Sequence, residues 1–210
     1  EVALPVCASL GVLTAQQARR LREAGICRYN HNLQTSRAFY RRIVTTHDYQ
    51  IRCETVQIVR EAGMEACCGA LFGMGESWAD RIDLAFELRN LQVEVVPLNF
   101  LIPIRGTPLE AQPPLSAMEC LHITALYRFI LPDRRIKIAG GREVNLRDMQ
   151  SWIFFAGANG MIIGNYLTTC GRAPEQDHQM LRDLGLSLAG AAEIEQNPER
   201  VATQETAVSA

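Results

Sequence analysis

The chain has 210 residues, of which 48% are hydrophobic and 21% charged, a composition typical of a globular protein with a substantial core. Its net charge of −2 at pH 7 gives no reason to expect nucleic acid or an anionic membrane as a partner. No apolar run reaches the roughly 18 residues that a membrane-spanning helix needs.

The seven cysteines form an odd set with no regular spacing, at positions 7, 27, 53, 67, 68, 120 and 170. Without a secretory signal pattern, such a set indicates reduced thiols, metal ligands and core fillers rather than disulfides. Of the 21 basic residues only one is a lysine, Lys137.

Apolar runs and helical periodicity alternate along the chain. The first predicted helix is capped by Thr14 and ended by Gly25. Strands are expected over residues 2–7, 26–32, 64–72, 93–103 and 135–139. Helices are expected over residues 13–25, 49–62, 78–91, 116–130, 147–156 and 174–184. The residues after 188 are poor in large apolar side chains, so we expect a tail, 189–210, that is disordered or a frayed helix.

Five alternations of strand and helix predict a parallel α/β sheet with right-handed crossovers. Five units are too few to close an eight-stranded barrel, so either the sheet is open or about three units precede Glu1. Because the chain starts at Glu1 inside an apolar run, we expect that its beginning is missing.

The central motif of the sequence follows the second predicted strand and reads Tyr29-Asn30-His31-Asn32-Leu33. Asn30 and Asn32 are two residues apart, so both amides point to the same side of a strand. An amide carries a donor and an acceptor, which suits a ligand such as a urea or an amide. The alternative is a polar turn in which Asn caps the next helix.

Other strands also carry unusual groups, namely Cys7, Cys67, Asn99 and Lys137. A buried cysteine is commonly a small hydrophobic residue. A buried Asn or Lys without a partner costs about 1–3 kcal/mol or more, so their convergence predicts a polar pocket at the carboxyl ends of the strands. The run from Gly69 to Glu76 has the form G-x-[IL]-x-G-x-x-E, in which glycines let a flat ring approach the backbone.

Together these motifs resemble the second half of the biotin synthases, radical S-adenosylmethionine enzymes, up to about residue 186. The segments that carry the resemblance are residues 7–11, 29–33, 40–46, 69–76, 106–109, 139–143 and 156–159. The resemblance implies a TIM-type (β/α)8 barrel, incomplete here at its N-terminus, with residues 1–188 as the partial barrel domain. It implies S-adenosylmethionine and a radical-generating [4Fe–4S] cluster with ligands upstream. A second, auxiliary cluster, expected to be [2Fe–2S], donates sulfur to dethiobiotin.

The resemblance also implies roles for single residues. Cys7 and Cys67 match ligands of the auxiliary cluster, and Lys137 lies near that cluster. The residues expected at dethiobiotin, whose cyclic urea suits amides, are Asn32, Asn99 and Asn30. Those expected at S-adenosylmethionine are Gln34, Leu71, Gly73 and Ile102.

Several features depart from the family pattern. The three-cysteine motif for the radical-generating cluster and a third auxiliary cysteine are not found in the sequence. Gln34 stands where the family often has an acidic residue, and Lys137 stands where many members have an arginine. Arginine and lysine are not equivalent there, because a guanidinium is a planar fork and an ammonium is a point charge. Cys27 and Cys68 alternate outward and are expected to be core thiols, and His31 is expected to be a satisfied core histidine. Cys53, Cys120 and Cys170 are expected to have only structural roles.

We therefore expect a cytoplasmic enzyme that inserts sulfur into dethiobiotin, with flavodoxin or ferredoxin as electron donor, a homodimeric assembly, and no nucleic acid or membrane partner. The 210-residue chain alone is expected to be inactive. One alternative is a related radical enzyme with another small substrate. The other is a truncated, non-catalytic binding protein.

Overall fold

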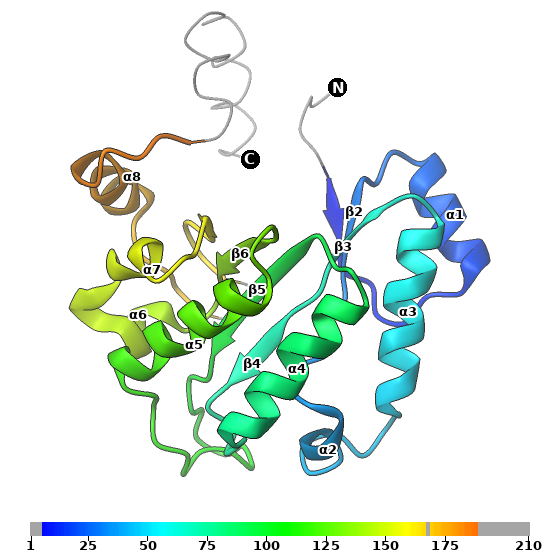
Figure 1. Ribbon diagram of the computed structural model, residues 1–210, viewed down its shortest axis with the longest axis horizontal. Helices are drawn as coiled ribbons and strands as arrows, with labels where there is room; N and C mark the ends of the chain where they lie inside the picture. The colour runs from blue at the N-terminus through cyan, green and yellow to red at the C-terminus, as the bar shows by residue number, and fades with distance from the viewer. Residues whose placement is uncertain (1–5, 167–168, 189–210) are drawn as a thin grey trace, which may run out of the picture.

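The structure is a computed structural model that describes residues 6–166 and 169–188. The expected tail, residues 189–210, and most of the first expected strand lie outside these described residues. In Figure 1 four helices stand in a row along one side of the sheet, namely α1 (Ala15–Glu23), α3 (Tyr49–Glu61), α4 (Trp78–Asn90) and α5 (Ala117–Ile130).

Within the described residues, seven strands form one sheet in which every neighbouring pair is parallel. The sheet order is β1-β2-β3-β5-β6-β7, and β4 pairs with β5. The strands are β1 (Cys7–Ala8), β2 (Arg28–Asn30), β3 (Glu65–Cys67), β4 (Ala70–Phe72), β5 (Val95–Phe100), β6 (Arg135–Ile138) and β7 (Gly160–Met161). The predicted parallel α/β class is confirmed.

The main helices begin where the sequence places capping residues. Thr14 accepts a hydrogen bond from the Gln17 amide, and Ser77 and Ser116 cap α4 and α5 in the same way. Among the described helices, none combines the length and apolar character that crossing a membrane requires. The helices are α1 (Ala15–Glu23), α2 (Arg37–Tyr40), α3 (Tyr49–Glu61), α4 (Trp78–Asn90), α5 (Ala117–Ile130), α6 (Arg142–Leu146), α7 (Trp152–Phe155) and α8 (Pro174–Asp183), with a 3-10 turn η1 (Arg147–Met149).

Several local expectations are wrong. The helix expected over residues 147–156 is instead the 3-10 turn η1 and the short helix α7, and a further short helix, α6, begins at Arg142, where a loop was expected. Arg147 separates α6 from the residues after it because its φ of +50° is outside the helical region. The short strand β7 was expected to be a Gly-rich loop, since two residues carry no alternation pattern. The short helix α2 was not expected either.

The strand expected over residues 64–72 is divided into β3 and β4. Both halves keep one register with β5, since Cys67 is opposite Val95 and Ala70 is opposite Leu98. Pro97 lies between these pairs and has no amide hydrogen, so the ladder is interrupted there. A Cβ on Gly69 would lie 1.9 Å from the Pro97 carbonyl oxygen, so the close approach requires glycine.

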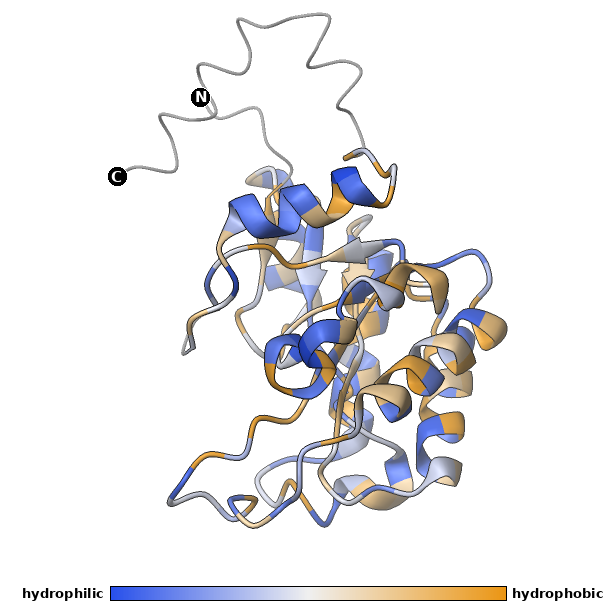
Figure 2. Ribbon diagram, turned by 90° about the vertical axis from the view of Figure 1, so that its left-hand side faces the viewer, coloured by the Kyte–Doolittle hydropathy of each residue, from blue (hydrophilic) through white to orange (hydrophobic). Residues whose placement is uncertain are grey.

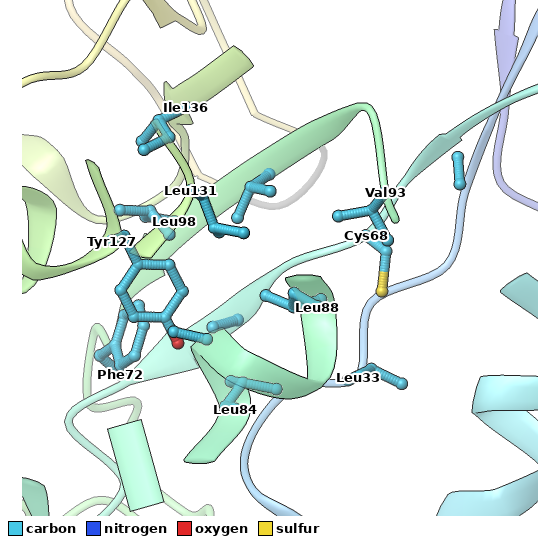
Figure 3. Packing of buried hydrophobic residues seen from close by; sticks show 14 of the residues in the cluster. Leu33, Cys68, Phe72, Leu84, Leu88, Val93, Leu98, Tyr127, Leu131 and Ile136 are labelled. Carbon is cyan, nitrogen blue, oxygen red and sulfur yellow. The ribbon is translucent and has the colours of Figure 1, made fainter. Parts of the chain in front are cut away.

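The core lies between the sheet and the outer helices. Leu33, Cys68, Leu98 and Ile136 on the sheet side face α4 and α5, where Leu84, Leu88 and Tyr127 pack against them (Figure 3). Figure 2 shows that the helices carry both hydrophobic and hydrophilic residues.

The other face of the sheet keeps polar side chains that are only partly buried. Along β2 and the residues after it, Tyr29 and Leu33 are buried, whereas Asn30, Asn32 and Gln34 are half-buried. This strict alternation gives the sheet an inner, polar face opposite the helix layer.

Helix α8 is attached to α6 by a buried ion pair. The Arg142 guanidinium donates to both carboxylate oxygens of Asp177 and to Gln150, and neither charged side chain is exposed. Burial alone would lower the pKa of Arg142, but hydrogen bonding to Asp177 and its negative charge raise it. Removing one partner of such a pair leaves a buried charge uncompensated.

We therefore expect Asp177→Ala to lower the free energy of unfolding of the complete gene product by about 3–5 kcal/mol. Asp183→Ala, which changes an exposed carboxylate of the same helix region, should change it by less than about 0.5 kcal/mol. Urea titrations followed by circular dichroism measure both, and equal effects of the two variants would contradict this role of Asp177.

Candidate functional site

A cavity of about 440 Å³ opens at the carboxyl ends of the strands. This is the end at which parallel α/β proteins bind ligands, because the loops that follow the strands converge there. We call it the amide cavity, and it is lined by Asn32, Gln34, Leu71, Asn99, Phe100, Leu101, Ile102, Ile104, Gly140, Gly141, Ile162, Tyr166 and Thr169. The structure thus brings five of the sequence-predicted site residues to one cavity, namely Asn32, Gln34, Leu71, Asn99 and Ile102.

Gly73, also predicted at this site, does not line the cavity. It has a φ of +94°, lies against Leu115 and Leu101, and donates its amide hydrogen to Glu76. Its role in the structure is to shape the turn after β4.

The side-chain amide oxygen of Asn32 is hydrogen-bonded, whereas its amide nitrogen has no acceptor among the described residues. Its Oδ1 accepts hydrogen bonds from the Gly69 amide at 3.0 Å and from Asn30 Nδ2 at 3.4 Å. Nδ2 of Asn32 meets no acceptor among the described residues, so Asn32 offers the cavity a hydrogen-bond donor. This polarity suits a carbonyl oxygen on the ligand.

Asn99 joins three chain segments around the cavity. Its Nδ2 donates to the Ala70 carbonyl at 2.9 Å, and its Oδ1 accepts from the Gly140 amide at 3.0 Å. One N–H and one lone pair remain for a ligand. Asn99 therefore holds β4 and the loop after β6 in place as well as facing the cavity.

Gln34 lies at the cavity in an uncommon backbone conformation, with a φ of +75°. Such a left-handed residue costs on the order of 1 kcal/mol or more and persists where neighbouring contacts hold it. Two backbone hydrogen bonds do so here, from Gln34 N to the Gly69 oxygen and from Leu71 N to the Gln34 oxygen. They fix the point from which the uncharged side-chain amide enters the cavity.

Tyr166 is a cavity residue that the sequence reasoning missed, because it follows the unexpected strand β7. Its hydroxyl lies 3.1 Å from both the Ala139 carbonyl and a Glu143 oxygen. Burial, and after it the Glu143 carboxylate, raise the pKa of Tyr166 to about 12, so the phenol stays protonated and acts as a donor. A tyrosine soon after a Gly-rich segment was the signal that could have indicated it.

Deeper on the same inner face lies a second group, which we call the thiol level: Cys7, Cys67 and Asn30. Cys7 is opposite Arg28, and Asn30 is opposite Cys67, so the three share one face of the sheet. Asn30 Nδ2 donates to the Cys67 sulfur at 3.3 Å. Burial raises the pKa of the Cys7 thiol, and the neighbouring Cys67 raises it further, whereas Arg28 and Lys137 oppose this shift.

The thiol level has more positive than negative charge around it. Arg28 and Arg135 both pair with Glu65, at 2.6 and 2.5 Å, and Lys137 lies on the next row of β6. Within the described residues Lys137 has no ion-pair partner. Arg28, Arg135 and Lys137 together carry three positive charges, and Glu65 carries one negative charge. This excess of positive charge suits an anionic group, and a thiolate-bound iron–sulfur cluster is anionic.

The residues present fit such a cluster in part. Cys7, which is exposed, and Cys67, which is buried, lie on one face of the sheet, and the cationic side chains near them suit a cluster's negative charge. A cluster, however, takes about four protein ligands. No group of three or more His, Cys, Asp or Glu side chains with metal-binding geometry occurs in the part of the chain that the structure describes. Any cluster held by Cys7 and Cys67 therefore needs further ligands.

Of the two cysteines expected to be core thiols, Cys68 lies in the core, whereas Cys27 lies outside the core cluster. Cys68 is fully buried in the core, and Cys53 and Cys120 are buried on α3 and α5. Burial raises the pKa of both Cys53 and Cys120 to about 12, so these thiols stay protonated. Cys27 is half-buried and donates to the Val6 carbonyl, and Cys170 is exposed.

His31 is buried on the helix side, as expected, but it is not fully satisfied. Its Nε2 has no hydrogen-bond partner among the described residues. Burial lowers the pKa of His31 to about 4, with Arg52 and then His47 adding to the effect, so the ring is neutral at pH 7.

Arg52 on α3 contacts, from the helix side of the sheet, the segment of residues 30–34, which we call the asparagine segment. It donates to the Asn32 carbonyl at 2.7 Å, to the Tyr40 hydroxyl at 2.6 Å and to His47 Nε2 at 3.0 Å. A guanidinium has only donors, so all three partners must accept. The Asn32 backbone is therefore fixed by a residue outside the cavity.

We expect Arg52→Met to loosen this segment by about 1.5–3 kcal/mol, so that the amide hydrogens of His31 and Gln34 exchange roughly tenfold faster or more. Hydrogen–deuterium exchange measures this. Arg37→Met is the matched control, because Arg37 also lies over a tyrosine ring, Tyr49, but bonds to Gln50 rather than to the asparagine segment. If the Arg37 and Arg52 variants exchange alike at these two amides, Arg52 does not hold the segment.

Comparisons with known proteins agree with this geometry. Residues 5–88 match the radical SAM superfamily, and residues 97–187 match the Biotin and Thiamin Synthesis associated domain. The biotin synthase of Geotalea daltonii is 57% identical over 189 residues, and that of Carboxydothermus hydrogenoformans is 56% identical over 188. These alignments cover 90% of this chain but 57% and 58% of the relatives.

The fold also matches solved structures. A methylornithine synthase superposes with a TM-score of 0.77 at 22% identity, covering 92% of this chain and 61% of that one. HydG, a maturase of the [FeFe]-hydrogenase, superposes with a TM-score of 0.74 at 17% identity, covering 89% of this chain and 46% of its own. These likenesses concern the fold alone and identify the sheet as part of a TIM-type barrel. By sequence, the chain is similar to biotin synthases along about 90% of its own length, and it spans a little under three fifths of the length of these relatives.

Proposed function

We propose that the complete gene product is a biotin synthase, which inserts sulfur into dethiobiotin. The observation that carries the proposal is the order of groups on one face of the sheet. The amide cavity lies at the strand ends, and the thiol level lies directly behind it on β1, β2 and β3. A substrate held by amides would therefore lie next to sulfur.

When bound, S-adenosylmethionine with its [4Fe–4S] cluster would supply hydrogen abstraction, and an auxiliary [2Fe–2S] cluster would supply the sulfur. The chain's own residues bind, orient and shield the substrate. Asn32 would donate its free Nδ2–H to the urea carbonyl, and Asn99 would use its remaining N–H and lone pair on the same ring. Both amides are held by backbone groups, so little ordering is needed on binding.

The apolar part of the cavity would take the adenosine portion. Leu71 and Ile102 form this wall, and Gln34 approaches from the fixed left-handed position described above. Gly73 would act indirectly, by shaping the turn after β4. An uncharged Gln34 would accept or donate one hydrogen bond to a hydroxyl, where a carboxylate could only accept.

At the thiol level, Cys7 and Cys67 would supply thiolates to the auxiliary cluster. Lys137 would lie near it as a counter-charge and not as a ligand, because an ammonium has no lone pair to give. The proposal also includes residues 1–188 as one partial barrel domain, a cytoplasmic location, a homodimer, and flavodoxin or ferredoxin as electron donor. These last features rest on the family resemblance.

We expect Asn32→Ala in the complete gene product to weaken dethiobiotin binding by about 1–3 kcal/mol, with a smaller loss for S-adenosylmethionine. The free donor of Asn32 is specific to a carbonyl on the substrate. Isothermal titration with each ligand measures the two losses. Equal losses would mean that Asn32 shapes the whole cavity and does not recognise the urea.

Cys67→Ala should abolish retention of the auxiliary cluster's iron and sulfide after anaerobic reconstitution, while the radical-generating cluster remains. S-adenosylmethionine cleavage is then retained, but biotin does not form. Iron and sulfide analysis with product assays measures this. The matched control is Cys68→Ala, since Cys68 is adjacent in sequence and faces the core. Full iron content and normal biotin yield in Cys67→Ala would refute the sulfur-donor assignment.

A further inference from the structure

Tyr166 lines the amide cavity, and its hydroxyl is placed between acceptors. The hydroxyl oxygen lies 3.1 Å from the Ala139 carbonyl oxygen, 3.1 Å from Glu143 Oε1 and 3.3 Å from Glu143 Oε2. A carbonyl and a carboxylate only accept, and a phenol has one hydrogen to donate. That hydrogen is therefore used within the protein, so Tyr166 offers a ligand its aromatic ring and no hydrogen-bond donor.

The turn that carries Tyr166 packs tightly behind the ring. The Tyr166 amide donates to the Thr169 carbonyl at 3.0 Å, and the Gly171 amide donates to Asn165 Oδ1 at 3.2 Å. A Cβ on Gly171 would lie 2.0 Å from the Gly164 carbonyl oxygen and 3.3 Å from the Tyr166 ring. The backbone contacts hold one end of the side chain, and the hydroxyl contacts hold the other.

Glu143 is the stronger of the two anchors of the hydroxyl. A hydrogen bond to a carboxylate is charge-assisted and about twice as strong as one between neutral groups such as a phenol and a carbonyl. The carboxylate is held in turn, since Arg142 Nε lies 3.4 Å from Glu143 Oε1 and the Arg142 guanidinium is buried against Asp177. Two neighbouring residues of α6 thus have different tasks, because Arg142 holds α8 and Glu143 holds the cavity wall.

We propose that Glu143 is a positioning residue, which acts through the Tyr166 hydroxyl and fixes the aromatic ring as a wall against which the ligand's own ring lies. This inference rests on the proposed function, because it takes the urea ring of dethiobiotin as the ligand. A wall that is fixed before the ligand arrives needs little ordering on binding. Since Tyr166 has no hydrogen to give, the urea carbonyl is directed toward the amide of Asn32.

The test measures dethiobiotin binding to the complete gene product by isothermal titration. Tyr166→Phe and Glu143→Ala should each raise the Kd about tenfold, because each removes the same hydrogen bond to a charged group. The double variant should also raise the Kd only about tenfold, since one bond is lost only once. A loss of about a hundredfold in the double variant would mean that the two residues act separately, and it would overturn the inference.

Glu143→Gln keeps an acceptor oxygen for the hydroxyl, so it should recover most of the affinity that Glu143→Ala loses. Glu175→Ala is the matched control, because it removes an exposed carboxylate from α8, and it should bind as the wild type does. Wild-type affinity in Tyr166→Phe or in Glu143→Ala overturns the inference, and so does a Glu143→Gln variant as weak as Glu143→Ala. If the wild-type protein itself does not bind dethiobiotin, the proposed function fails instead, so the two failures are distinguishable.

Discussion

The asparagines and cysteines of the inner face lie where they do because side chains alternate along parallel strands. Each strand places alternate residues against the outer helices, where only apolar groups are stable without partners. The intervening residues face the inner side of the sheet. Along β2 and the residues that follow it, this rule separates Tyr29 and Leu33, which enter the core, from Asn30 and Asn32, which face inward. A one-residue shift in register would bury the amides and expose the core.

Close backbone contacts set the shape of the inner face. Gly69 packs against the Pro97 carbonyl, and a Cβ on Gly141 would lie 1.8 Å from the Phe100 carbonyl oxygen. Both contacts require glycine, and both lie at the level where the amide cavity begins. Asn99 bonds across the same region from β4 to the loop after β6, so the cavity is held by backbone groups on both sides.

The site is best described by which hydrogen-bonding groups are already used. Among the described residues, Asn30 gives both of its N–H groups to protein acceptors, Asn99 gives one, and Asn32 Nδ2 gives none. The three asparagines therefore differ in how many hydrogen bonds they can still offer a ligand. Charge is also unevenly distributed, since Glu65 pairs with both Arg28 and Arg135, whereas Lys137 has no ion-pair partner in the part of the chain that the structure describes.

The sequence by itself determined the parallel α/β class, the capped outer helices and five of the residues that line the amide cavity. It could do so because helix caps and strand alternation are local, and because the carboxyl ends of parallel strands always lie at one edge. It did not determine the division of β3 from β4, which depends on Pro97 of another strand. It also missed β7 and with it Tyr166, since two residues carry no periodic pattern. Only the tertiary structure decided that Asn30 faces a sulfur and that Arg52 holds Asn32, because both are contacts between residues far apart in the chain.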